Sequence, residues 1–312
     1  MKFVYLSLIV FLSLTINVLA ANAVAANAVA ANAVAANAEA VNNRAVNDER
    51  FVADYFPSGK QGNYGVIVLT GSAGGKTNEM AEAIANLGYP TLSLAYFRDG
   101  PLPEALELIP LEYFEAPKQW LMDQKETRAD GVLILGLSKG AELALVLAAH
   151  DADYKGTVAV APSSVVWSGI PKDTSTIAQA SSSWSLNGKP LDHVPYVSRT
   201  GLKKAGLSKM VYWHTASLAN AEAVEKALIK AENIHSPFLL LTGGKDSVWP
   251  AKHMAESLCG KANTPENASV CTHINYDEAG HMAGLEHFTL GESTQSTSPV
   301  YKDIATFLQA IQ

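Results

Sequence analysis

Cysteine and excess positive charge are both scarce in this sequence. Two cysteines in 312 residues exclude a disulfide-rich scaffold and a four-cysteine zinc site. Lys and Arg number 23 against 30 Asp and Glu, which gives a formal net charge of −7. This charge has the wrong sign for neutralising phosphates, so we expect no nucleic-acid partner. Hydrophobic residues at 48% and charged residues at 17% predict instead a globular protein with its own core.

Long apolar runs are also lacking, and the longest candidate lies at the N-terminus. Lys2 precedes an apolar stretch at residues 4–18, and small residues follow it, which is typical of a secretory signal peptide. The stretch is about 15 residues long and contains polar side chains, so it is short for a membrane span. We expect residues 1–20 to be cleaved, leaving an exported, periplasmic or secreted protein with no stable membrane span. An uncleaved membrane anchor is the alternative.

Residues 21–50 form a low-complexity leader built on the repeat Ala-Asn-Ala-Val-Ala. The repeat carries almost no charge and no large apolar group, so it has nothing to bury in a core. A five-residue period is also too short for a solenoid, whose repeat unit needs about 20 residues. We therefore expect a mobile leader followed by one domain at residues 51–312.

Apolar runs and helical spacing alternate along residues 51–312. A near-continuous apolar run predicts a strand buried on both faces at residues 64–70, and further strands are predicted at residues 91–95, 131–135, 157–161, 237–242 and 272–276. Helical spacing predicts helices at residues 77–87, 111–121, 142–150, 217–232, 250–258 and 300–311. This alternation predicts an α/β fold with a mainly parallel sheet and helices on both faces.

Residues 163–213 interrupt the alternation. They are rich in Ser, Gly and Pro, and Asn187-Gly188 predicts a hairpin turn within them. A long irregular segment inside a compact domain is typical of a lid-like or binding insertion.

A G-x-S-x-G motif, Gly136 to Gly140, lies between the predicted strand at 131–135 and the helix that follows. This strand–turn–helix setting is the one in which the motif presents a nucleophilic serine, here Ser138. The flanking glycines remove the Cβ atoms that would clash in so sharp a turn. The alternative is a tight turn with an inert serine. We expect the Lys139 side chain to be a solvent-facing charge or a weak substrate contact.

A nucleophilic serine needs a base, and the base needs an acid that orients it. In this setting the expected chain order is Ser, acid, His. Asp246 and His281 each come directly after a predicted strand, where sites of open parallel sheets lie. We therefore predict that Ser138, Asp246 and His281 are the catalytic residues. Asp277, on the same loop as His281, is the alternative acid.

The reaction also requires donors for a developing oxyanion. We predict that one is the backbone N–H of Lys139, directly after the nucleophile. The other is expected from the glycine-rich loop at residues 71–75, through Ser72 or Ala73. This loop lacks the G-x-x-x-x-G-K-[ST] spacing of a phosphate-binding loop, and we expect neither a cofactor nor a metal.

At this point the chain resembles the C-terminal domain of the bile acid-CoA:amino acid N-acyltransferase / acyl-CoA thioester hydrolase family. The resemblance spans roughly residues 64–312 and lies in Gly71-Ser-Ala-Gly-Gly75, Leu94-Ala-Tyr-Phe97, Leu111-Glu-Tyr-Phe-Glu115, Gly136-Leu-Ser-Lys-Gly-Ala-Glu-Leu143, Ser236-Pro-Phe-Leu-Leu-Leu-Thr-Gly-Gly-Lys-Asp-Ser-Val-Trp-Pro250 and Ala279-Gly-His281. It implies an α/β-hydrolase fold and acyl transfer through a covalent intermediate, with Ser138, Asp246 and His281 as the triad.

The chain departs from that family in two respects. Members from eukaryotes carry an N-terminal β-sandwich domain, for which residues 21–63 leave no room. The amino-acid-conjugating members have Cys where this chain has Ser138, and serine favours water as the acyl acceptor, so the resemblance implies hydrolysis. Because export would separate the protein from cytosolic coenzyme A thioesters, another ester, thioester or amide is the alternative substrate.

Taken together, the sequence predicts an exported serine hydrolase that acts on a small acyl ester or thioester. Cys259 and Cys271 are expected to form a disulfide in an oxidising compartment, and two buried free thiols are the alternative. The competing functions are a lipase or peptidase on the same fold, and a catalytically silent binding protein. The sequence carries no signal for the oligomeric state.

Overall fold

A computed structural model describes residues 43–264, 270–285 and 298–311. The predicted signal peptide at residues 1–20 and most of the predicted leader lie outside the described residues. The described chain opens with β1 (Arg44–Ala45), which pairs antiparallel with β2 (Val52–Phe56). The strand β1 thus lies inside the segment, residues 21–50, that the sequence assigns to the leader.

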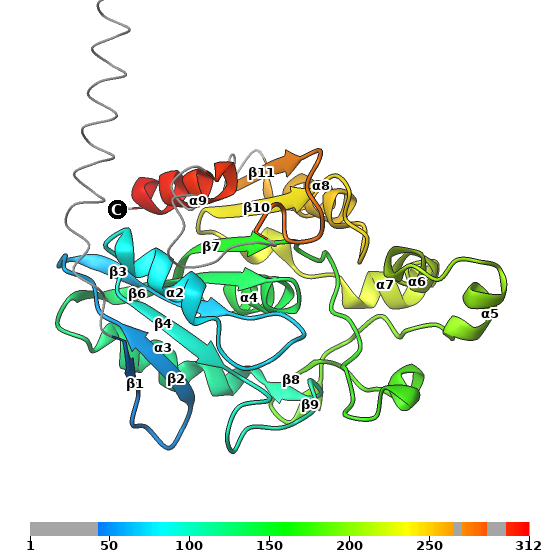
Figure 1. Cartoon of the computed structure of the whole chain (residues 1–312), viewed down its shortest axis with the longest axis horizontal. Helices are drawn as coiled ribbons and strands as arrows, with labels where there is room; N and C mark the ends of the chain where they lie inside the picture. The colour runs from blue at the N-terminus through cyan, green and yellow to red at the C-terminus, as the bar shows by residue number, and fades with distance from the viewer. Residues whose placement is uncertain (1–42, 265–269, 286–297, 312) are drawn as a thin grey trace, which may run out of the picture. The chain divides into compact units, whose positions relative to one another are not determined.

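The centre of the fold is an eight-stranded sheet with the order β1-β2-β4-β3-β6-β7-β10-β11 (Figure 1). Its remaining strands are β3 (Asn63–Leu69), β4 (Thr91–Ala95), β6 (Thr127–Leu137), β7 (Tyr154–Val160), β10 (Phe238–Gly243) and β11 (Cys271–Tyr276). These six are parallel, whereas β1 and β2 run antiparallel at one edge. Each strand predicted from an apolar run coincides with one of the six.

The strand β2, which lies between β1 and β4, escapes the sequence pattern because Asp54 interrupts its apolar residues. Asp54 is nevertheless only 8% exposed. Its carboxylate accepts hydrogen bonds from Lys76 Nζ at 3.0 Å and from Asn78 Nδ2 at 2.7 Å, so the buried charge is compensated.

Helices cover both faces of the sheet (Figure 1). α2 (Asn78–Asn86) and α9 (Pro299–Ala310) lie on one face, where the Tyr301 hydroxyl donates to the Ala83 carbonyl at 2.9 Å. α3 (Glu115–Met122), which follows the 3₁₀ turn η1 (Leu111–Phe114), lies on the other face with α4 (Lys139–His150) and α8 (Ala251–Ala262). This double cover explains the near-continuous apolar runs, since both faces of the central strands are buried.

The strand order changes direction at the neighbouring strands β3 and β6. From β3 the chain crosses to β4 on one side, and it then returns to β6 on the other side of β3. The loops that follow β3 and β6 therefore leave the sheet in opposite directions, which is the position where open α/β sheets bind ligands. The glycine-rich loop follows β3, and Ser138 follows β6 directly.

Residues 163–213 contain more regular structure than the sequence predicts. β8 (Trp184–Leu186) and β9 (Lys189–Pro190) form a hairpin, and with β5 (Ile109–Pro110) they make a small three-stranded sheet. The hairpin turn at Asn187 and Gly188 has φ values of 52° and 72°, as Asn-Gly predicts. A 3₁₀ turn, η2 (Thr174–Gln179), and α5 (Arg199–Lys204) also belong to this segment.

The prediction of one helix at residues 217–232 is wrong. The structure has α6 (Met210–Ser217) and α7 (Ala221–Ala227), followed by the 3₁₀ turn η3 (Ala231–Asn233). The break arises because the side chain of Asn220 accepts a hydrogen bond from Ala223 N at 3.2 Å and so caps a new helix.

A buried ion pair attaches the insertion to α4. Lys139 is 2% exposed and Glu142 is 0% exposed, and Lys139 Nζ lies 2.6 Å from Glu142 Oε2. The other carboxylate oxygen of Glu142 accepts from Trp167 N at 3.1 Å and from Trp184 Nε1 at 2.8 Å. Burial lowers the pKa of Lys139 and raises the pKa of Glu142, and the attraction between the two charges opposes both shifts.

The expectation of a solvent-facing Lys139 is therefore wrong. α4 begins at Lys139, three residues before the predicted start, and the insertion covers this first turn. Trp167 and Trp184, the two residues that reach Glu142, are fully buried. The first part of the segment at 163–213 is thus packed into the domain.

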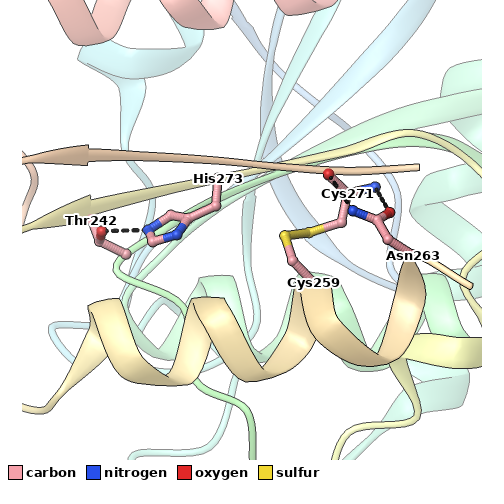
Figure 2. Close-up of a disulfide and its surroundings, with 5 residues drawn as sticks. All are labelled: Thr242, Cys259, Asn263, Cys271 and His273. Carbon is pink, nitrogen blue, oxygen red and sulfur yellow. Dashed lines mark hydrogen bonds between the residues drawn. A yellow bond between two sulfur atoms is a disulfide. The ribbon is translucent and has the colours of Figure 1, made fainter. Parts of the chain in front are cut away.

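Figure 2 shows the disulfide between Cys259 of α8 and Cys271 at the start of β11. Beside it, Asn263 Nδ2 donates to Cys271 O at 3.0 Å, and Cys271 N donates back to Asn263 Oδ1 at 2.9 Å. These contacts join α8, which follows the Asp246 loop, to the strand that leads to His281.

Removing the Glu142 carboxylate should destabilise the protein strongly. Glu142→Ala leaves the Lys139 ammonium and two donors buried without their partner, which costs about 3–5 kcal/mol. Chemical denaturation measures the loss. The exposed pair of Glu222 and Lys226, 2.8 Å apart, provides the control, and Glu222→Ala should lower the stability far less, because solvent screens this pair. Equal losses in the two variants would contradict the account of the buried pair.

Removing the disulfide should lower the free energy of unfolding by a smaller amount, independently of the buried ion pair. The bridge joins residues 12 positions apart, and constraining a loop of this size in the unfolded chain is worth about 2–3 kcal/mol. We expect the Cys259→Ser, Cys271→Ser variant to unfold earlier in denaturant by that amount, and to match the wild-type protein once both are reduced. A remaining difference under reducing conditions would show that the substitutions act through packing.

Candidate active site

Ser138 occupies a strained turn between β6 and α4. Its φ of 54° lies in the left-handed region, which L side chains rarely adopt. A Cβ on Gly136 would collide with the backbone of Gly140, and a Cβ on Gly140 would collide with the Thr70 carbonyl. Ser138 N donates to Val160 O at 2.8 Å and ties the turn to the neighbouring strand. The glycines at both positions are thus a steric requirement of this turn.

Three side chains distant in sequence meet at this turn. His281 Nε2 lies 2.8 Å from Ser138 Oγ, and His281 Nδ1 lies 2.8 Å from Asp246 Oδ2. The His281 side chain is 16% exposed and that of Asp246 is 4% exposed. With its proton on Nδ1, the imidazole donates to the carboxylate and leaves Nε2 free to accept the serine proton. The geometry fits a nucleophile, a general base and an orienting acid.

Backbone contacts fix Asp246 relative to His281. Gly244 N donates to Tyr276 O and Lys245 N donates to Ala279 O, each at 2.9 Å, so the loops after β10 and β11 run against each other. A Cβ on Gly243 would collide with the Gly280 carbonyl, which explains the glycine there.

Two backbone N–H groups also fix the orientation of the Asp246 carboxylate. Asp246 Oδ1 accepts from Val248 N at 2.7 Å and from Trp249 N at 3.2 Å, which leaves Oδ2 directed to the imidazole. The alternative acid, Asp277, is exposed and accepts from Asn275 Nδ2 at 2.6 Å. The structure therefore brings Asp246, and not Asp277, to His281.

The glycine-rich loop lies against the nucleophile. A Cβ on Gly71 would lie 3.1 Å from Ser138 Cβ, so only a glycine approaches this closely without displacement. Arg98 Nη1 donates to Ser72 O at 3.4 Å, and Gly75 N donates to Phe97 O at 2.9 Å, which fasten the loop to residues 97–98.

The predicted oxyanion donors flank Ser138. Ser72 and Ala73 are exposed in the loop beside the nucleophile. Lys139 is the first residue of α4, so its N–H has no acceptor within the helix. Their role as oxyanion donors stays a prediction.

An aromatic cluster beside His281 was not predicted from the sequence. Trp249 contacts His281 edge-on with ring centroids 5.5 Å apart, and it is stacked with Trp167 at 6.3 Å. His214 of α6 contacts both indoles edge-on. Burial lowers the pKa of His214 to about 4. The three tryptophans at 167, 213 and 249 carry no periodic signal, so their convergence appears only in the folded chain.

The indole N–H groups of Trp167 and Trp249 are buried and have no hydrogen-bond partner among the described residues. Such donors are uncommon in folded proteins. Across the described ranges, no group of three or more His, Cys, Asp or Glu side chains is placed to hold a metal ion. No helix in these ranges is long and apolar enough to cross a membrane.

The sequence is similar to curated acyl-coenzyme A thioesterases. Acyl-coenzyme A thioesterase 2, mitochondrial, of Homo sapiens is 29% identical over 228 residues, which cover 72% of this chain and 44% of that protein. Acyl-coenzyme A thioesterase 6 of Mus musculus is 29% identical over 251 residues, covering 77% of this chain and 55% of that protein. The chain thus spans about half the length of the curated relatives it matches.

Solved structures agree on the fold. An esterase of Pyrococcus furiosus superposes with a TM-score of 0.54 at 14% identity, covering 86% of this chain and 92% of that one. An α/β hydrolase from a Penicillium species superposes with a TM-score of 0.55 at 16% identity, covering 86% and 98%. At such low identity the likeness establishes an α/β-hydrolase fold, as the sequence predicts.

The family model described as BAAT / Acyl-CoA thioester hydrolase C terminal matches residues 109–289, more than half of the chain. The match includes the nucleophile elbow and the loops of Asp246 and His281. The chain belongs to the BAAT / acyl-CoA thioester hydrolase C-terminal family and has an α/β-hydrolase fold.

Proposed function

We propose that this protein is an exported serine hydrolase that cleaves acyl esters or thioesters through an acyl-enzyme intermediate. The observation that carries the proposal is the continuous hydrogen-bonded chain from Asp246 through His281 to Ser138, with both contacts at 2.8 Å. Family membership supports the reaction class, and the names of the relatives, acyl-coenzyme A thioesterases, support the bond type.

In the acylation step, His281 Nε2 takes the proton of Ser138 while Oγ attacks the acyl carbonyl carbon. Asp246 stabilises the imidazolium that forms and keeps the ring in its orientation. The tetrahedral intermediate carries an oxyanion, which the N–H of Lys139 and a donor of the loop at 71–75 stabilise. When the intermediate collapses, the bond to the leaving group breaks, and the imidazolium returns the proton to the leaving thiolate or alkoxide.

In the deacylation step, water replaces the leaving group. His281 accepts a proton from the water as its oxygen attacks the acyl-serine carbonyl, and a second tetrahedral intermediate forms. Its collapse breaks the bond between the acyl carbon and Ser138 Oγ and releases the carboxylic acid, and the His281 imidazolium returns its proton to Oγ, which restores the hydroxyl. The scheme uses only side chains, backbone donors and water.

The substrate is a small acyl ester or thioester, and an acyl-coenzyme A thioester is the form that the relatives' names favour. Export points to other thioesters, esters or amides. The disulfide between Cys259 and Cys271 supports export, because such bonds persist in oxidising compartments. One relative is named as mitochondrial, so an exported chain would differ from it in location.

Replacing the proposed nucleophile should abolish turnover. We expect Ser138→Ala to lower kcat for p-nitrophenyl esters and for acyl-coenzyme A by at least about 10⁴-fold, because no other group attacks the carbonyl. Steady-state kinetics on both substrates provide the measurement. Wild-type rates in this variant would exclude Ser138 as the nucleophile.

The acid should be identified by a matched pair of variants. Asp246→Asn removes the charge that orients His281 and should lower kcat by about 10³–10⁴-fold. Asp277→Asn makes the same change on the exposed neighbouring acid and should leave kcat unchanged. The reverse pattern would assign the acid to Asp277 and reject the geometry described above.

Export should leave a mature chain that begins at Ala21. Loss of residues 1–20 removes Lys2 and no acidic residue, so the formal charge of −7 becomes more negative by one. Intact mass of the protein recovered outside the cytoplasm tests this. Ala20→Phe places a bulky residue where the peptidase requires a small one and should prevent cleavage at this site. A full-length chain confined to the cytoplasm would contradict the proposal.

A further inference from the structure

Residues 197–212 form a basic surface on an otherwise acidic protein. Arg199, Lys203, Lys204 and Lys209 lie within this segment, and no Asp or Glu occurs between His193 and Ala221. The three lysines are exposed. Lys118, Lys226 and Lys245 elsewhere in the fold each contact a carboxylate, whereas the basic residues of this segment have no acidic residue among them in the sequence.

The same segment carries most of the exposed large apolar side chains. Among the described residues four such side chains are exposed, and three of them lie here: Val197 at 37%, Leu207 at 40% and Tyr212 at 42%. Lysines and apolar groups therefore alternate over α5, the following loop and the start of α6. We call residues 197–212 the basic apolar face.

This face stands away from the sheet but is coupled to the catalytic loops. Figure 1 shows α5 beyond α6, far from the strands β1 and β2. Val211 N donates to Ser247 O at 2.9 Å, one residue after Asp246. Trp213 is buried against Tyr196, with ring centroids 4.3 Å apart, and Arg199 lies over the Trp213 ring at 5.0 Å. The basic apolar face is thus attached to the Asp246 loop by a backbone hydrogen bond and to the domain by the ring contacts of Trp213.

We propose that the basic apolar face docks the protein on an anionic lipid bilayer. A bilayer with acidic headgroups complements the lysines, and its acyl boundary accepts Val197, Leu207 and Tyr212. Peripheral binding of this kind requires exposed apolar groups beside clustered positive charge, and both occur together on this face. The net charge of −7 disfavours adsorption through other surfaces, so docking orients the protein.

Docking in this orientation would bring the catalytic loops close to the bilayer. Ser247 couples the face to the Asp246 loop, so the site lies near the point of contact. An acyl substrate concentrated in the membrane would then reach Ser138 without first dispersing in water. The inference concerns binding and does not require that Ser138 be the nucleophile.

The test compares cosedimentation with two kinds of vesicle, phosphatidylcholine alone and phosphatidylcholine mixed with phosphatidylglycerol. The wild-type chain should partition more strongly to the anionic vesicles, and added salt should weaken the preference. The combined variant Lys203→Glu, Lys204→Glu, Lys209→Glu should lower that partition by at least about tenfold. Residues 1–42 are common to every variant, so only differences between variants and between vesicles count.

The matched control reverses the charge at three exposed lysines outside the basic apolar face: Lys125→Glu, Lys172→Glu and Lys302→Glu. It changes the net charge by the same amount and should retain the wild-type preference. A second variant, Leu207→Ser with Tyr212→Ser, should lose the partition that persists at high salt. Turnover of a soluble ester should be unchanged in all of these variants, which shows that they are folded. Measuring partition of Ser138→Ala keeps the result independent of catalysis.

Three outcomes would overturn the proposal. One is a wild-type chain with no preference for anionic vesicles, and another is a control variant that loses as much partition as the lysine variant. The third is a lysine variant that raises KM for a soluble acyl-coenzyme A while its vesicle partition stays unchanged. That last result would assign the cluster to the phosphates of a substrate rather than to a lipid surface.

Discussion

The sharp turn at Ser138 is the constraint on which the rest of the site depends. It forces a positive φ on a residue that has a Cβ, and it is tolerated because Gly136 and Gly140 allow the neighbouring backbone to approach closely. The strained turn places the Ser138 hydroxyl at the end of β6, beside the loop that follows β3. Every other feature of the site serves to place a group around this oxygen.

Several parts of the fold share in that placement. Parallel pairing of β10 with β11 brings the Asp246 loop and the His281 loop to the same edge, and the disulfide fastens the segments that flank them. The buried charge of Glu142 joins the insertion to the helix that starts at the nucleophile. Trp249 links the Asp246 loop to the imidazole through ring contact. The site is therefore supported from both halves of the sheet.

The sequence is informative where one pattern has one physical meaning. Apolar runs predict the central parallel strands because strands buried on both faces allow little else, whereas the edge strand β11 is only partly buried and has a mixed sequence. Prediction from the sequence fails where the same residue is compatible with two different structures. Lys139 and Glu142, three positions apart, resemble an exposed ion pair on a helix, and only tertiary packing shows that both are buried. Asn220 is compatible both with a helix interior and with a helix cap, and only the structure shows that it caps α7. Asp54 makes β2 hard to recognise in the sequence, because Lys76, which compensates its buried charge, lies elsewhere in the chain.

The most direct test of the central claim is covalent labelling of the folded protein with a fluorophosphonate, followed by peptide mass mapping. The reagent reacts with serines whose hydroxyl a neighbouring base activates. The account predicts a single adduct on the peptide that contains Ser138, and its loss when His281 is replaced by Gln. A folded protein that takes up no label, or that carries it on a different serine, would contradict the account.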